Sequence, residues 1–310
     1  MMAMQADKRI ESHIDGQSWA LLALLSVIWG GSFMFVGVAV KELPALLIVF
    51  ARVAIAAAIL IPVHLVLQGP LPRDRRTWLA CAGMSLFNNV LTFTAIAWGQ
   101  HYISSGLASV INATTPMFGA LFMALTGMER LTGRKSIALL LGLIGVVVLK
   151  GGNFGDFGAQ SLGILAVTFA SACYGISSVW SKKFMMGIPP MTAATCQLIG
   201  SAIMMGVLAF SFSTPTQYFH MSQSTLNALL GLAALSTSIA YLIFFRIIQR
   251  AGASFVVLVT MLVPVSAIIL GILVLNEKLT SNEFAGALII GLALIIIDGR
   301  LLKKMGWSAP

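Results

Sequence analysis

Long apolar stretches separated by short polar joints dominate this chain. Ten of them approach the roughly 20 apolar residues that a helix needs to cross a bilayer. Pro and Gly clusters such as Gly69-Pro70 and Pro189-Pro190 mark the joints. The pattern predicts an all-α membrane protein with ten transmembrane helices, at approximately 18–40, 44–67, 77–98, 104–126, 134–151, 160–182, 190–212, 223–246, 252–275 and 281–300.

Composition narrows the class of protein. Of 310 residues, 58% are hydrophobic and only 9% are charged, whereas a soluble domain carries about 25% charged residues. This excludes a soluble enzyme, a nucleic-acid-binding protein and a disordered chain. Cys81, Cys173 and Cys196 lie in apolar runs without CxxC spacing, so we expect buried hydrophobic side chains rather than disulfides or metal ligands. The first apolar run is too long for a signal peptide and should remain as helix 1.

Basic residues predict the orientation, because cytoplasmic loops are enriched in Lys and Arg. With the N-terminus in the cytoplasm, the outer side holds only Lys41, Lys150 and Lys278. The cytoplasmic side holds Lys8, Arg9, Arg73, Arg75, Arg76, Arg130, Arg134, Lys135, Lys182, Lys183, Arg246, Arg250, Arg300, Lys303 and Lys304. We therefore expect both chain ends in the cytoplasm, as tails 1–17 and 301–310, and the bacterial inner membrane as the location.

The chain contains an internal repeat. Residues 77–151 align without gaps with 225–299, so that Pro116 matches Pro264 and Glu129-Arg130-Leu131-Thr132 matches Glu277-Lys278-Leu279-Thr280. The predicted units are a first five-helix repeat, 18–151, and a second, 160–300. Because five is odd, the second repeat must cross the membrane upside down. Inverted repeats are typical of secondary transporters with a midplane site and alternating access, although duplication can also build channels or scaffolds.

Several motifs carry a family resemblance over essentially the whole chain. They are Trp29-Gly30-Gly31-Ser32, Pro44 followed by Arg52, and a mid-helix Pro followed by Glu-(Arg/Lys)-Leu in both halves. The chain resembles the drug/metabolite transporter (DMT) superfamily, EamA type, and within it the YddG-type exporters of aromatic amino acids. Two departures are the looser Tyr174-Gly175-Ile176-Ser177 and Leu198 at the position equivalent to Arg52.

Polar groups at the depth of the bilayer centre are costly and need a reason. Helix 3 carries Asn88 about 17 Å from Thr77 along its axis, near the midplane. Contacts between helices also use Ser and Thr, so a structural role stays open for each residue. The candidate substrate-binding polar residues are Ser32, Asn88, Asn89, Thr92, Asn112, Thr115, Ser177, Ser178, Ser236, Thr237 and Thr260.

Two prolines and several aromatic residues complete the candidate site. Pro116 and Pro264 should free the carbonyls of Asn112 and Thr260 four residues earlier, giving either a hinge with a ligand contact or a tolerated kink. The aromatic candidates for stacking on a flat substrate are Trp29, Tyr174 and Tyr241, with Phe87, Phe93, Trp98 and Trp180 as further options.

Arg52 is the one charge well inside a predicted span, about 12 Å beyond Pro44. It could bind a substrate carboxylate or hold an outer gate, but the resemblance marks this Arg as general among EamA-type proteins, which favours a structural role. No Asp or Glu lies at mid-span. We therefore expect no carboxylate-based proton coupling.

The leading hypothesis is an exporter of aromatic or bulky apolar amino acids; the alternative is a broad drug or metabolite exporter. A nucleotide-sugar carrier would need basic groups at the site. A membrane enzyme would need an acid/base or metal cluster, and a channel a ring of charge or carbonyls. We expect a small-molecule substrate and the lipid bilayer as partners, with no cofactor, metal or nucleic acid. Substrate range, coupling and oligomeric state, with a monomer as one option, stay open.

Overall fold

A computed structural model describes residues 15–151 and 158–299 as a bundle of helices. The predicted tail 301–310, most of the tail 1–17, and Lys8, Arg9, Arg300, Lys303 and Lys304 lie outside these residues. The first repeat contains α2 (Gly16–Ala39), α3 (Ala45–Gln68), α4 (Arg75–Met84), the π-helix η2 (Ser85–Val90), α5 (Leu91–Gly99), α6 (Ser105–Asn112), α7 (Thr115–Leu125) and α8 (Gly133–Leu149).

The second repeat has the same order of elements, with one added 3₁₀-helix between its second and third crossings. It contains α9 (Ala159–Phe184), α10 (Pro190–Phe212), the short 3₁₀-helix η3 (Pro215–His220), α11 (Gln223–Leu230), the π-helix η4 (Gly231–Ile239), α12 (Ala240–Ala251), α13 (Ala253–Val256), α14 (Val259–Leu275) and α15 (Ser281–Asp298). Together, these elements account for all ten predicted crossings.

Eight of the helical segments in the described residues are long and apolar enough to span a bilayer. The other two crossings are α14 and α8, each of 17 residues, which is at the lower limit for a span. The predicted bounds need three corrections. The eighth span continues to Ala251 rather than 246, the ninth is divided by a turn at 257–258, and the fourth is divided at 113–114.

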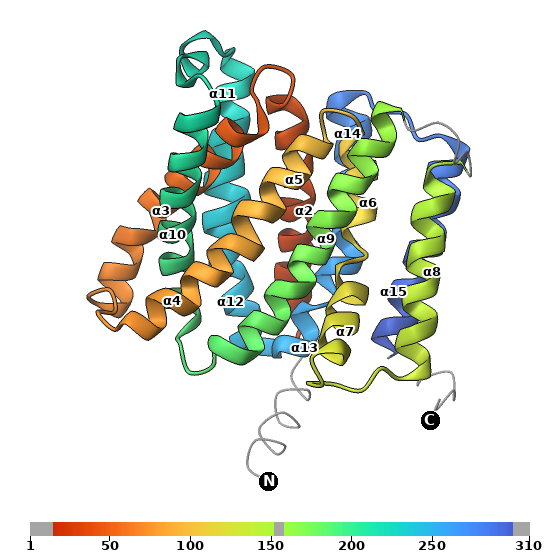
Figure 1. The fold of residues 1–310 in the computed structure, drawn as a ribbon, viewed down its shortest axis with the longest axis horizontal. Coiled ribbons are helices and arrows are strands. Elements are labelled where there is room, and N and C mark those ends of the chain that lie inside the picture. Colours follow the sequence, from red (N-terminus) through yellow and green to blue (C-terminus); the bar gives the residue numbers. More distant parts are fainter. Residues whose placement is uncertain (1–14, 152–157, 300–310) are drawn as a thin grey trace.

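The two repeats are inverted. In Figure 1, α2, α4–α5 and α8 ascend while their counterparts α9, α11–α12 and α15 descend. The packing follows the same symmetry: α2 contacts α14 and α11–α12, and its counterpart α9 contacts α6–α7 and α4–α5. Two helix pairs, α3 with α10 and α8 with α15, join counterparts directly.

The charges divide between the two ends of the bundle. We call the end where α2 begins and α15 ends the basic face, and the other end the opposite face. The joints α3–α4, α7–α8, α9–α10 and α12–α13 lie at the basic face (Figure 1), and they or the adjoining helix ends hold Arg73, Arg75, Arg76, Arg130, Arg134, Lys135, Lys182, Lys183, Arg246 and Arg250. The joints of the opposite face hold Lys41, Lys150 and Lys278.

Close glycine contacts fix α2 and α9 at their centres. A Cβ at Gly30 would lie 2.8 Å from the backbone nitrogen of Ala267 in α14, and a Cβ at Gly175 would lie 2.8 Å from the backbone carbon of Phe118 in α7. These two contacts are symmetry counterparts. Because atoms this close leave no room for a side chain, glycine allows the paired helices to pack backbone to backbone.

Candidate functional site

A central cavity of about 550 Å³ lies between the two repeats. Its deep wall includes Phe33, Val36 and Arg52, and its lining continues to Met185 and Ile188 in the α9–α10 joint of the basic face. None of its described lining residues comes from a joint of the opposite face. The cavity is therefore open toward the basic face and closed toward the other end.

Most of the predicted site residues line this cavity. They are Trp29, Ser32, Arg52, Asn88, Asn112, Thr115, Pro116, Tyr174, Ser236, Thr237, Tyr241, Thr260 and Pro264. The cavity also contains residues that sequence reasoning left out, including Phe244, Phe245 and Met84. Phe244 lies 5.6 Å from Trp29 between ring centroids, and no pattern in the sequence distinguishes it from other apolar residues of α12.

Asn89 does not face the cavity, contrary to the prediction. It is fully buried between η2 and α10, where its Nδ2 donates to Ser201 Oγ at 2.8 Å and its Oδ1 accepts from Gln197 Nε2 at 2.9 Å. Thr92 is also fully buried, with its hydroxyl donating to the Phe87 carbonyl at 2.6 Å. Neighbouring residues point in different directions around a helix, so Asn88 faces the cavity and Asn89 faces α10.

Ser177 and Ser178 also lie outside the lining of the central cavity. Ser177 Oγ lies 3.1 Å from Asn88 Oδ1, so it orients an amide that does line the cavity. Ser178 Oγ donates to the Tyr174 carbonyl at 3.0 Å and lines a second cavity. The prediction that both side chains line one midplane site with Asn88 is therefore wrong.

Two π-helices carry several polar residues of the site. The counterparts η2 and η4 both lie at mid-helix, and they carry Asn88, Asn89, Ser236 and Thr237. A π-turn adds a residue to the helical turn and is frequent at functional sites. Here the wider turn shifts the side chains that follow it, which helps to separate the cavity-facing residues from those that pack on α10 or α3.

The hydroxyl groups that line the cavity largely donate to carbonyls of their own crossing. Ser32 donates to the Trp29 carbonyl at 2.6 Å, and Thr115 to the Asn112 carbonyl at 2.7 Å. Ser236 instead donates to the Ile28 carbonyl of α2 at 2.8 Å. The Asn112 carbonyl, for which Pro116 offers no backbone N–H, is therefore occupied by the Thr115 hydroxyl rather than free for a ligand. Pro116 lies in the first turn of α7, after the break in the fourth crossing.

The side-chain oxygen of Asn112 has no hydrogen-bond partner among the described residues, although it is buried. A buried acceptor without a partner costs about 1–3 kcal/mol. Asn112 lines the central cavity, and its buried Oδ1 would meet a ligand donor group there only after the side chain rotates.

Arg52 also faces the cavity. Its Nε donates to Thr237 Oγ1 at 3.0 Å, and its guanidinium carbon lies 3.6 Å from the centre of the Phe93 ring. The side chain is 9% exposed, and none of the ion pairs in the described residues involves it. A cation held by a hydroxyl and an aromatic ring keeps its charge available to a ligand.

Three aromatic candidates lie elsewhere. Trp98 is 39% exposed and contacts Tyr102 near the opposite face. The Nε1 of Trp180 donates to the Ala80 carbonyl at 2.9 Å, and this bond joins α9 to α4. The Trp180 ring also packs near Phe87. The aromatic wall of the central cavity instead consists of Trp29, Phe33, Phe93, Tyr174, Tyr241, Phe244 and Phe245.

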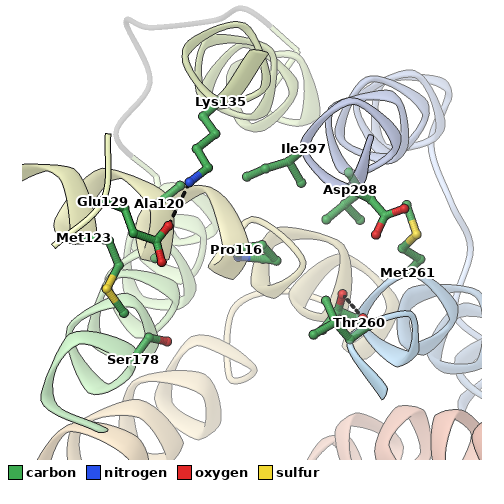
Figure 2. A pocket seen from close by; sticks show the side chains of 13 residues that line it. Pro116, Ala120, Met123, Glu129, Lys135, Ser178, Thr260, Met261, Ile297 and Asp298 are labelled. Atoms are coloured by element: carbon green, nitrogen blue, oxygen red, sulfur yellow. Dashed lines mark hydrogen bonds and ion pairs between the residues drawn. The ribbon is translucent and has the colours of Figure 1, made fainter. Parts of the chain in front are cut away.

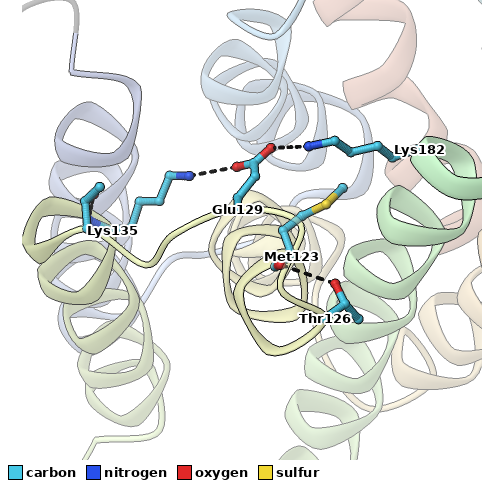
Figure 3. Close-up of polar contacts among 6 residues, drawn as sticks. Met123, Thr126, Glu129, Lys135 and Lys182 are labelled. Atoms are coloured by element: carbon cyan, nitrogen blue, oxygen red, sulfur yellow. Dashed lines mark hydrogen bonds and ion pairs between the residues drawn. The ribbon is translucent and has the colours of Figure 1, made fainter.

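A second cavity of about 410 Å³ adjoins the first at Pro116 and Thr260. Figure 2 shows it between α7, α14 and α15, with Glu129, Lys135 and Asp298 at its edge. Glu129 accepts from Lys135 at 2.8 Å and from Lys182 at 2.9 Å (Figure 3), and these hydrogen bonds lower the pKa of its carboxyl to about 2. The cluster lies at the basic face.

Comparison with known proteins agrees with this architecture. The chain matches the family described as "EamA-like transporter family" twice, over residues 17–150 and 161–298. It belongs to the EamA-like transporter family. The protein is therefore a multi-pass membrane transporter of the DMT superfamily, built from two copies of one repeat, as the resemblance and the internal alignment predicted.

Its relatives are similar over nearly their full length. An "Uncharacterized transporter YoaV" of Bacillus subtilis (strain 168) is 27% identical, over 87% of this chain and 93% of the relative. A "Probable amino-acid metabolite efflux pump" of Escherichia coli (strain K12) is 26% identical, over 92% and 95%. A solved crystal structure shares the fold, with a TM-score of 0.62 at 18% identity over 93% of this chain and 99% of that one.

Proposed function

We propose that this transporter exports amino acids with aromatic or bulky apolar side chains by alternating access. The observation that carries the proposal is Arg52, a cation that faces the central cavity without an acidic partner in the described residues. Charged groups inside a membrane are rare and usually mark a substrate pathway. A substrate carboxylate would supply the counter-charge that the described residues do not.

The remaining groups of the cavity suit the rest of an amino acid. Asn112 lines the cavity, and its Oδ1 has no partner among the described residues, so rotation of this side chain would let it accept a hydrogen bond from the substrate ammonium group. Trp29, Tyr174, Tyr241 and Phe244 offer apolar ring faces to its side chain. The similarity to a protein named as a probable amino-acid metabolite efflux pump supports this substrate class.

Orientation gives the direction of transport. The basic face carries most of the described Lys and Arg residues, and cytoplasmic loops are enriched in these residues. We infer that this face, with both chain ends, lies in the cytoplasm of a bacterial cell with the protein in the inner membrane. The central cavity is open there, so the state seen here would receive substrate from the cytoplasm.

The decisive experiment is flux into sealed proteoliposomes. Labelled tryptophan and phenylalanine are expected to exchange across the membrane, whereas a labelled sugar or nucleotide is not. Empty liposomes and liposomes with heat-denatured protein give the background. If no amino acid exchanges above that background, the proposed substrate class is wrong.

A broad drug or metabolite exporter is the second candidate, because the cavity has many aromatic side chains and a volume of about 550 Å³. The role of Arg52 distinguishes these two candidate functions. An amino acid should require its charge, whereas an uncharged aromatic drug should not. Equal transport of tryptophan and of an uncharged aromatic compound, both insensitive to Arg52→Met, would favour the broad exporter.

A further inference from the structure

Glu129 and Glu277 occupy the same position in the two repeats, after the fourth and ninth crossings. Their local backbones agree: the Glu129 N–H donates to the Met123 carbonyl at 3.1 Å, and the Glu277 N–H donates to the Gly271 carbonyl at 3.1 Å. Met123 and Gly271 are themselves counterparts. The two loops are therefore alike, and a difference in what the two carboxylates bind reflects their surroundings.

At the opposite face, Glu277 links the α14–α15 loop to the start of α6. Its carboxylate accepts from the backbone N–H of Ser105 at 2.7 Å, from the Ser105 hydroxyl at 2.8 Å and from the backbone N–H of Gly106 at 3.1 Å. These donors lie at the start of α6, so the bonds join the α14–α15 loop to the fourth crossing. A Cβ at Gly106 would lie 3.3 Å from Ile268 Cγ1 in α14. The end of the bundle is closed at this point.

Glu129 makes no such contact at the basic face. It pairs with Lys135 of α8 and Lys182 of α9 instead (Figure 3). Symmetry places the counterparts of Ser105 and Gly106 at residues 253 and 254, and the counterpart of Ile268 at Ala120. Ala120 lines the second cavity. At the opposite face, the equivalent place is filled by the contact between Gly106 and Ile268. At the basic face, the second cavity lies where the symmetry-related contact would form.

We propose that Glu277 and Glu129 are alternating latches of the two ends. In the state described here Glu277 holds the opposite face closed, and Glu129 is released to Lys135 and Lys182. In the other state Glu129 leaves both lysines and binds the backbone N–H groups at 253 and 254. The second cavity then closes, and Glu277 releases the start of α6. This mechanism rests on the alternating access of the proposed function but on no particular substrate.

The latch is strong enough to shift the balance between two states. A carboxylate that accepts from two backbone N–H groups and a hydroxyl forms charge-assisted bonds, which are about twice as strong as neutral ones. Glu277→Gln keeps the shape but removes the charge, so we expect the ratio of the two states to change by about tenfold. The change should favour the state that is open at the opposite face.

Two cysteine reporters at counterpart positions can measure this ratio without any substrate. Ala120→Cys lies in the second cavity, and Ile268→Cys lies in the closed contact of the opposite face. Each is introduced alone, with purified protein in nanodiscs that expose both faces to a polar thiol reagent. Without a further change, the thiol at position 120 should react faster than the thiol at position 268. With Glu277→Gln, labelling at position 268 should rise and labelling at position 120 should fall, each by several-fold.

The control is Lys278→Gln, which removes the neighbouring exposed charge and should leave both rates unchanged. If Glu277→Gln is not recovered as folded protein, Ser105→Ala removes one of the three bonds and should give the same opposed shift at smaller size. A parallel rise at both reporters, or no change at either, would overturn the latch. Because the assay contains no substrate, a failure of amino acid flux leaves this test unaffected.

Discussion

The two repeats are alike where they form the scaffold and unlike where they form the site and the gates. Gly30 and Gly175 make equivalent contacts at the centre of the bundle, whereas Arg52 corresponds to Leu198 and Asn112 to Thr260. Glu129 and Glu277 correspond in sequence but bind different partners. Symmetry thus provides the framework on which two states can form, and the differences provide the chemistry.

The largest effect should come from Arg52, whose charge is present in one repeat only. Arg52→Met should lower amino acid transport by about tenfold or more, since hydrogen bonds to charged groups contribute about 1.5–3 kcal/mol. The measurement is flux of tryptophan against tryptamine, which lacks the carboxylate. The loss should be confined to tryptophan.

Leu198→Met is the matched control for this comparison. Leu198 is fully buried in α10 at the counterpart position, and a Leu-to-Met exchange of similar volume is well tolerated. Its transport should equal that of the unchanged protein. An equal loss for tryptophan and tryptamine in Arg52→Met would instead assign Arg52 to the structure of the bundle.

The next effect tests the shared scaffold. Gly30→Ala and Gly175→Ala each place a Cβ 2.8 Å from backbone atoms of the partner helix, which should destabilise the protein by about 1–3 kcal/mol. Both melting temperatures should fall by similar amounts. Gly291→Ala is the control, because a Cβ there meets nothing within 4 Å. A fall for only one of the two variants would show that the central contacts are not equivalent.

A smaller effect is expected from Asn112→Thr, which gives the first repeat the residue of the second. It removes the unpartnered acceptor, so we expect an increase in KM of about three- to tenfold for an amino acid with a free ammonium group. N-acetylated tryptophan, which has no ammonium group, should be affected little. A similar increase in KM for both compounds would remove Asn112 from the ammonium site.

The smallest effect concerns the ion pairs of Glu129. Its lowered pKa, about 2, means that the pairs stabilise the fold above the ordinary carboxyl pKa near 4.5 and lose this contribution only as the pH falls toward 2. These side chains are partly exposed, so the pairs contribute little. Glu129→Gln should change the melting temperature by the same small amount at pH 6 and pH 8. A strong dependence between these values would contradict the pairing.

Sequence alone predicted the number of crossings and their inversion. A bilayer demands about 20 apolar residues per span, so apolar runs and their joints can be read directly, and an odd number of crossings per repeat forces the second copy upside down. The repeat alignment also pairs Pro116 with Pro264 and Glu129 with Glu277. Thirteen of the predicted site residues line the central cavity.

Only the tertiary structure decided which face of each helix meets the cavity. Lipid is as apolar as the interior of the bundle, so these helices are hydrophobic on all sides and their sequences do not mark the inward face. Asn88 and Asn89 are adjacent and equally polar, yet only Asn88 lines the cavity. The same holds for the two latches. Glu129 and Glu277 are equivalent in sequence, and the neighbours that packing brings to each carboxylate decide which end of the bundle is closed.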